Sequence, residues 1–184
     1  MGQEMMMIGK AIFALAAAST LTAVPACAAQ LEFDCDVPAN HFSSVSQDVT
    51  DGGGVSGTIR VDEMRKGDNL PVVGAGIFGP EQNAIAGFQL VAANDRAKVL
   101  DIIFNVSQDG TIKKGSVGKV DASSAIAFNI SLSATGKAVL TVNGNQFQAD
   151  ASAISGGRAM AFCSTAQFKF TNLIFSASGN GDGN

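Results

Sequence analysis

The chain has 184 residues and a net charge of −4, from 12 basic and 16 acidic side chains, so neither nucleic acid nor an anionic membrane surface is an expected partner. Its single histidine, His41, excludes a histidine-based metal centre and is the only base available to a Ser-His-Asp triad. Because no Gly-x-Ser-x-Gly motif accompanies it, we interpret His41 as a loop residue.

The N-terminal segment has the layout of a secretory signal peptide. Lys10 precedes about a dozen apolar or small residues, a run too short to span a bilayer comfortably. Ala26 and Ala28 form an A-x-A cleavage site, which predicts a signal peptide over residues 1–28 and export to the periplasm or the extracellular space. The alternative is that Cys27 lies in a lipobox and anchors an envelope lipoprotein. No later run is long enough for a transmembrane segment.

Two cysteines, Cys35 and Cys163, remain after cleavage, close to the two ends of the mature chain. In an oxidising compartment an even pair favours a disulfide, the alternative being two separate buried thiols. A disulfide requires the two Cα atoms to lie within about 7 Å, so we expect the first and last strands to be neighbours.

The rest of the chain shows the period of β-strands. Residues 125–133 alternate strictly between apolar and polar side chains, and Asn143-Gly144 and Asp109-Gly110 are typical of tight hairpin turns. Other strand-like runs cover 30–36, 55–61, 71–79, 85–93, 97–106, 137–150, 158–164 and 167–176. About eleven strands without a helical run predict an all-β sandwich. One domain over residues 29–176 and a disordered tail over 177–184 are expected.

Two segments resemble a known family. The run "FNISLSATGKAVLTVNGNQF" (128–147) and the closing "CSTAQFKFTNLIF" (163–175) are similar to the paired strands and last strand of concanavalin A-like lectin/glucanase and laminin G-like domains. The resemblance implies a two-sheet antiparallel jelly-roll sandwich with its terminal strands side by side. An immunoglobulin-like sandwich or another jelly roll is the alternative.

Hydrolases of that family carry an E-x-D-x-x-E pattern on one strand, which gives the paired carboxylates that retaining cleavage needs. The mature chain has only Glu32, Glu63 and Glu81, far apart, and the adjacent Asp62 and Glu63 would point to opposite faces of a strand. The sequence therefore predicts that the protein is not an enzyme.

The resemblance implies instead a non-catalytic, lectin-like binding module for a glycan or another surface ligand. The alternative is a structural or adhesive envelope protein that acts through protein contacts. The mature chain lacks Trp and Tyr, and Phe88, Phe104, Phe128 and Phe147 fall on inward positions, so no strong stacking platform is expected. The candidate ligand-binding residues are the outward polar ones, Gln89, Asn129, Ser131, Thr141 and Asn143.

The family likeness also makes a calcium site worth weighing, because calcium takes several hard oxygen ligands. The best local cluster is "SQDVTDGGG", with Asp48 and Asp51 in a loop. No complete ligand string is present, and solvated turn aspartates are the alternative. No other cofactor is expected.

Overall fold

The computed structural model describes residues 30–81 and 84–177. The predicted signal peptide, with Cys27, lies outside the described residues, and so does the predicted tail except for Ala177, the last residue of β12. The described residues form strands and no helix, so they include no helix that could cross a membrane. The strands are β1 (Leu31–Asp36), β2 (Phe42–Val49), β3 (Gly53–Met64), β4 (Val72–Phe78), β5 (Ala84–Ala92), β6 (Val99–Gln108), β7 (Thr111–Asp121), β8 (Ile126–Leu132), β9 (Lys137–Val142), β10 (Asn145–Asp150), β11 (Gly157–Ser164) and β12 (Ala166–Ala177).

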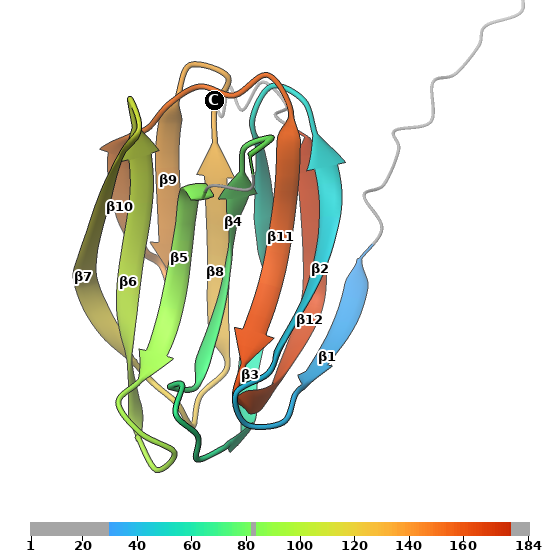
Figure 1. The fold of residues 1–184 in the computed structure, drawn as a ribbon, viewed down its shortest axis with the longest axis vertical. Helices are drawn as coiled ribbons and strands as arrows, with labels where there is room; N and C mark the ends of the chain where they lie inside the picture. The colour runs from blue at the N-terminus through green and yellow to red at the C-terminus, as the bar shows by residue number, and fades with distance from the viewer. Residues whose placement is uncertain (1–29, 82–83, 178–184) are drawn as a thin grey trace, which may run out of the picture.

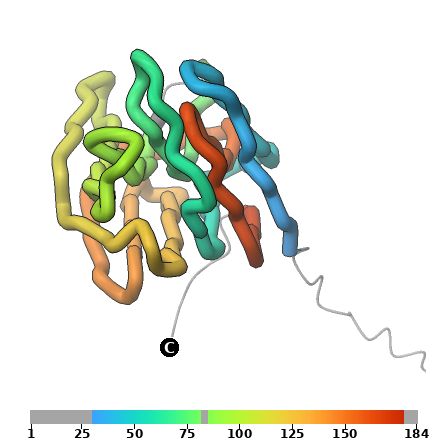
Figure 2. The backbone as a smooth tube through the Cα atoms, turned by 90° about the horizontal axis from the view of Figure 1, so that it is seen from below, coloured from blue at the N-terminus to red at the C-terminus, as the bar shows by residue number. Residues whose placement is uncertain are grey.

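Two antiparallel six-stranded sheets face each other (Figure 1). Sheet A has the order β1-β12-β3-β8-β9-β10, and sheet B has the order β2-β11-β4-β5-β6-β7. In both sheets an N-terminal strand pairs with a C-terminal one, β1 with β12 and β2 with β11, and blue and red strands run side by side in Figure 2. The expected all-β jelly-roll sandwich, with neighbouring terminal strands, is confirmed.

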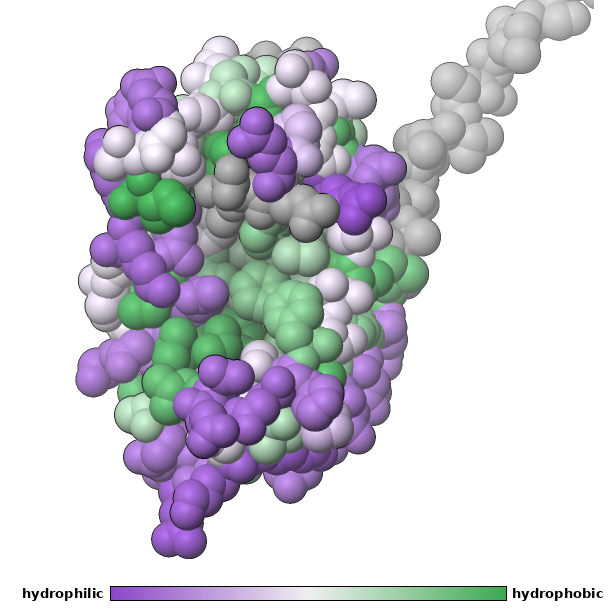
Figure 3. All heavy atoms as spheres, viewed as in Figure 1, coloured by the Kyte–Doolittle hydropathy of each residue, from purple (hydrophilic) through white to green (hydrophobic). Residues whose placement is uncertain are grey.

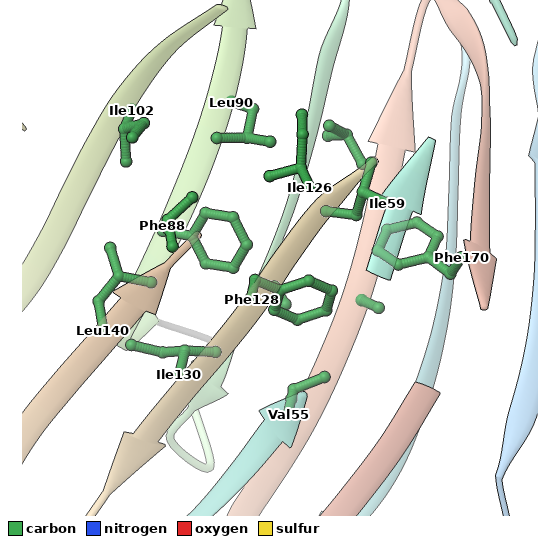
Figure 4. Packing of buried hydrophobic residues seen from close by; sticks show 14 of the residues in the cluster. Val55, Ile59, Phe88, Leu90, Ile102, Ile126, Phe128, Ile130, Leu140 and Phe170 are labelled. Atoms are coloured by element: carbon green, nitrogen blue, oxygen red, sulfur yellow. The ribbon is translucent and has the colours of Figure 1, made fainter. Parts of the chain in front are cut away.

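The core lies between the two sheets, because each strand directs alternate side chains inward. Rings from both sheets meet there: Phe88 of β5 lies 5.2 Å from Phe128 of β8, measured between ring centroids, and Phe128 lies 6.2 Å from Phe170 of β12 (Figure 4). Phe104 is also buried, as expected, whereas Phe147 on the edge strand β10 is only partly buried.

The sequence analysis did not identify β2. Its segment "FSSVSQDV" places serines on both faces and buries only Val49 fully, so the hydrophobic alternation is weak. Pairing with β11, from Val49 opposite Gly157 to Phe42 opposite Ser164, makes it the edge strand of sheet B. Tertiary contact, rather than local pattern, therefore defines this strand.

The predicted disulfide is present, with the Cα atoms of Cys35 and Cys163 6.1 Å apart. The bond does not join the two neighbouring terminal strands β1 and β12, because Cys163 lies on β11 in sheet B while Cys35 lies on β1 in sheet A. Both side chains point into the core, so the bond joins the two sheets rather than two neighbouring strands.

Candidate functional site on the outward face of sheet B

The outward face of sheet B lacks side chains at its centre. In β4, Val73, Ala75 and Ile77 point into the core, which leaves Gly74 and Gly76 on the outward face. Gly76 pairs with Gly87 of β5, so two neighbouring strands both present glycine at this level of the sheet. The glycines of the run "VVGAGIFG" therefore form part of an outward depression.

One row of paired residues crosses five strands at this level. It runs from Met160 of β11 through Gly76 and Gly87 to Asn105 of β6 and Lys114 of β7. Side chains are therefore present at both ends of the row and absent in its middle. We call the resulting depression the glycine hollow.

The glycine hollow has a volume of about 240 Å³. Its lining is mainly apolar and is made by Phe42, Ala75, Phe78, Gly87, Phe88, Gln89, Asn105, Met160 and Phe162. Figure 3 shows this face of the molecule, with hydrophobic surface across the middle and hydrophilic residues above and below it. A second, more open groove of about 530 Å³ continues from it past Asp68 and Leu70.

Two aromatic rings form one wall of the hollow. Phe42 of β2 and Phe162 of β11 have ring centroids 5.7 Å apart, and Phe42 is 58% exposed. The ring of Phe162 lies over Gly74, where a Cβ would come within 2.9 Å of its Cζ. The exposed ring of Phe42 therefore gives the hollow an aromatic surface that was not singled out from the sequence. The outward direction of Phe162 could be predicted from residues 158–164, where it alternates with the inward Ala161 and Cys163.

The polar groups of the hollow are few. Lys114 Nζ donates a hydrogen bond to Gln89 Oε1 at 3.4 Å, and no carboxylate among the described residues lies within ion-pair distance of this amine. The other cations of this face are paired, Lys119 with Asp101 and Arg158 with Asp48, both at 3.4 Å. Lys114 is thus available to an anionic ligand.

Asn105 carries a buried acceptor that nothing satisfies. Its Oδ1 is the one buried side-chain nitrogen or oxygen atom of the described residues without a hydrogen-bond partner. Such an atom costs about 1–3 kcal/mol, and native structures contain few of them. This could not be predicted from the sequence, because an asparagine in a strand is not unusual in isolation.

The predicted ligand-binding residues are not brought together. Gln89 lies in the glycine hollow, whereas Asn129, Ser131 and Thr141 lie on the outward face of sheet A, where Asn129 pairs with Thr141. Asn143 is in the β9–β10 turn with a φ of 47°, and its Oδ1 accepts a hydrogen bond from the Ala127 N–H at 2.8 Å. Its role there is to hold the turn.

The predicted calcium ligands, Asp48 and Asp51, lie in different elements. Asp48 is on β2 and pairs with Arg158, while Asp51 follows in the turn before β3. In the described part of the chain, no three His, Cys, Asp or Glu side chains are grouped so that they could hold a metal ion. His41 is an exposed loop residue, and its Nδ1 lies 2.9 Å from the Ala39 carbonyl oxygen.

The adjacent carboxylates Asp62 and Glu63 each form an ion pair with an arginine. Asp62 accepts from Arg60 Nε at 2.6 Å, and this hydrogen bond lowers the pKa of Asp62. Glu63 pairs with Arg65 at 2.8 Å. Both lie on sheet A, away from the glycine hollow, and they do not form a catalytic carboxylate pair.

No model of a protein family matches the chain, and no curated protein matches it. Solved structures do share its fold. A polysaccharide lyase of family 18 aligns with a TM-score of 0.56 and 9% identity over 77% of this chain and 82% of its own. An alginate lyase from Alteromonas sp. 272 aligns with a TM-score of 0.55 and 10% identity, over 77% of this chain and 81% of its own. An alginate lyase from Pseudomonas aeruginosa aligns with a TM-score of 0.52 and 13% identity, over 70% of this chain and 65% of its own.

These similarities establish the concanavalin A-like jelly-roll fold, and they also correct the inference drawn from it. The prediction of a non-catalytic lectin-like module, with its structural or adhesive alternative, was based on the resemblance of the fold. It is wrong, because the three neighbours with this fold are enzymes. The missing E-x-D-x-x-E pattern argues only against hydrolysis by paired carboxylates. A lyase cleaves by elimination, which does not need that pair.

Proposed function

We propose that this protein is a carbohydrate-active enzyme that binds an acidic polysaccharide along the outward face of sheet B and cleaves it by elimination. The observation that carries the proposal is the glycine hollow, where the exposed ring of Phe42, packed on the buried ring of Phe162, lies beside the polar groups of Gln89, Asn105 and Lys114. An apolar surface with a few placed polar groups suits a sugar ring, which has an apolar face and a polar edge.

The reaction class follows from the charges. Elimination takes the proton from C5, beside the carboxylate of a uronic acid, and forms a C4=C5 bond as the C4–O bond to the next sugar breaks. The departing glycosidic oxygen takes up a proton and leaves as a hydroxyl, so the step is balanced without an added reactant. Negative charge develops on the carboxylate during this step, and a fixed cation stabilises it. Lys114 is the cation of this face that has no carboxylate partner among the described residues, and we assign it that role.

The test is incubation of the purified protein with uronic acid polysaccharides, followed by ultraviolet absorbance, because the new C=C bond is conjugated with the carboxylate. Absorbance should rise with the unaltered protein and with Lys113→Ala, and it should be lost with Lys114→Ala. Lys113 is a matched control, since it neighbours Lys114 on β7 and bonds Gln108 instead of Gln89. Cleavage of neutral polysaccharides without an absorbance rise would contradict elimination.

A further inference from the structure

The unsatisfied Oδ1 of Asn105 is the starting observation. Asn105 lies between Gly87 and Lys114 in the row across sheet B. Gly87 has no side chain, and Lys114 Nζ bonds Gln89, so neither neighbour supplies a hydrogen bond to this oxygen. No side chain or backbone group among the described residues bonds this acceptor, which leaves it available to a group bound in the hollow.

The dimensions and chemistry of the hollow limit that group. Met160 and Asn105 are three strands apart, roughly 14 Å at the usual strand spacing, and only glycines stand between them. The walls are apolar, from Met160, Phe162 and Phe78. The occupant therefore needs an apolar part that fills the hollow and a hydrogen-bond donor directed at Asn105.

Three common substituents of sugars can be compared on these terms. A carboxylate has no donor and would bring a charge into apolar surroundings, which is costly. A hydroxyl has a donor but no apolar part. An acetamido group has an N–H donor, a methyl group for the apolar wall and a carbonyl oxygen that an amide such as Gln89 can bond.

We propose that the glycine hollow is the subsite for the acetamido group of an N-acetylated amino sugar. The acetamido N–H donates to Asn105 Oδ1, which reaches it by rotation about χ2, a broad torsion in asparagine. The methyl group packs against Met160 and Phe162. This assignment rests on the proposed function and refines its substrate: with Lys114 next to Asn105, a polymer that contains both N-acetylated amino sugars and uronic acids fits the face.

The test compares two neutral oligosaccharides that differ at one position. Chitohexaose carries an acetamido group on each sugar where cellohexaose carries a hydroxyl. Calorimetric titration should show chitohexaose binding at least about tenfold more tightly, the equivalent of one good hydrogen bond with its desolvation. Asn105→Ala should abolish that preference, so that the two hexasaccharides bind with equal affinity.

Asn129→Ala is the control, because Asn129 is an exposed strand asparagine on the opposite sheet, away from the hollow. It should keep the preference for chitohexaose. The melting temperature of Asn105→Ala should be equal to or above that of the unaltered protein, because the variant no longer buries an oxygen without a hydrogen bond. Functional sites often carry such destabilising groups.

Equal affinity for the two hexasaccharides, or an Asn105→Ala protein that keeps the preference, would overturn the acetamido subsite. So would loss of both affinities together with a lower melting temperature, which is the result of a purely structural role. An oligouronate that is cleaved with dependence on Lys114 while chitohexaose gains nothing from Asn105 would leave the proposed function standing and remove only this inference. Chitohexaose binding that depends on Asn105, without any cleavage of uronates, would support the acetamido subsite and contradict the proposed lyase activity.

Discussion

Cys35 of β1 and Cys163 of β11 join the two sheets of the sandwich through a buried disulfide whose Cα atoms lie 6.1 Å apart. The two residues are separated by 128 positions, so the bond closes almost the whole described chain into one loop. It fixes the N-terminal edge of sheet A to the C-terminal part of sheet B.

Replacing both cysteines, Cys35→Ser with Cys163→Ser, should lower the free energy of unfolding by roughly 4 kcal/mol, because a loop of this length restricts the unfolded chain strongly. Thermal or urea unfolding of the oxidised protein and the double variant gives the difference. Reduction of the unaltered protein should reproduce it. A double variant that unfolds at the same midpoint as the oxidised protein would contradict a stabilising role for the bond.

Glycine replacements on sheet B should differ according to the space that a methyl group finds. At Gly74 a Cβ would lie 2.2 Å from the Phe88 carbonyl oxygen, so Gly74→Ala must displace backbone and should destabilise by about 1–3 kcal/mol or more. At Gly87 the closest atom, the Ala75 carbonyl oxygen, is 3.2 Å away, so Gly87→Ala should retain the fold and mainly fill the hollow.

Gly115→Ala on β7 is the control for these variants, because a Cβ there meets nothing within 4 Å. The expected order of melting temperatures is Gly74→Ala lowest, then Gly87→Ala, then Gly115→Ala equal to the unaltered protein. Saccharide binding should fall for Gly87→Ala and not for Gly115→Ala. Unchanged binding by a folded Gly87→Ala protein would argue that the hollow is not the binding site.

Phe42 should contribute more to binding than to stability, because its side chain is 58% exposed and pairs with Phe162. Phe42→Ala should weaken oligosaccharide binding by roughly two- to tenfold, the size of one aromatic contact. Leu31→Ala, at a 41% exposed position on β1 of sheet A, should leave binding unchanged. Calorimetric titration of both variants measures the affinities. A Phe42→Ala protein that binds as tightly as the unaltered protein would exclude Phe42 from the site.

The pKa of the Asp121 carboxyl group, at the end of β7, should lie below the ordinary value of an aspartate. Its Oδ1 accepts hydrogen bonds from the backbone N–H and the hydroxyl of Ser123, both at 2.8 Å, and the backbone bond is the larger cause of its lowered pKa. The folded state therefore favours the charged form. This contribution to stability is present above the unfolded pKa, near 3.8, and is lost as the pH falls through the lower folded value.

Ser123→Ala removes the hydroxyl and keeps the backbone bond, so the pKa of Asp121 should rise part of the way back. Ser124→Ala is the matched control, because only the backbone N–H of Ser124 bonds residue 121, at the carbonyl oxygen. An NMR titration of the Asp121 carboxyl carbon measures both. Identical pKa values in the two variants would show that the Ser123 hydroxyl does not matter.

Local pattern in the sequence determined the class of the fold. Alternation in 125–133 predicts β8 because a strand directs successive side chains to opposite faces, a property of the chain alone. Asn143-Gly144 and Asp109-Gly110 predict hairpin turns because these residues accept positive φ, and they adopt 47° and 82°, and 50° and 75°. The cysteine pair could be predicted from the number of cysteines and the expected export. The edge strand β2 could not, because its polar segment becomes a strand only through β11.

Tertiary structure alone decided the candidate site. Gly76 and Gly87 are eleven positions apart, and only the register of β4 on β5 pairs them and leaves a hollow between Met160 and Asn105. Of the polar residues chosen from outward positions, only Gln89 lies there, because alternation gives the face of a strand but not the sheet to which the strand belongs. The same limit applies to Cys163, whose pairing with Cys35 could be predicted but whose place on β11 in sheet B could not. Sheet order and register depend on contacts between distant residues, which a local hydrophobic period does not encode.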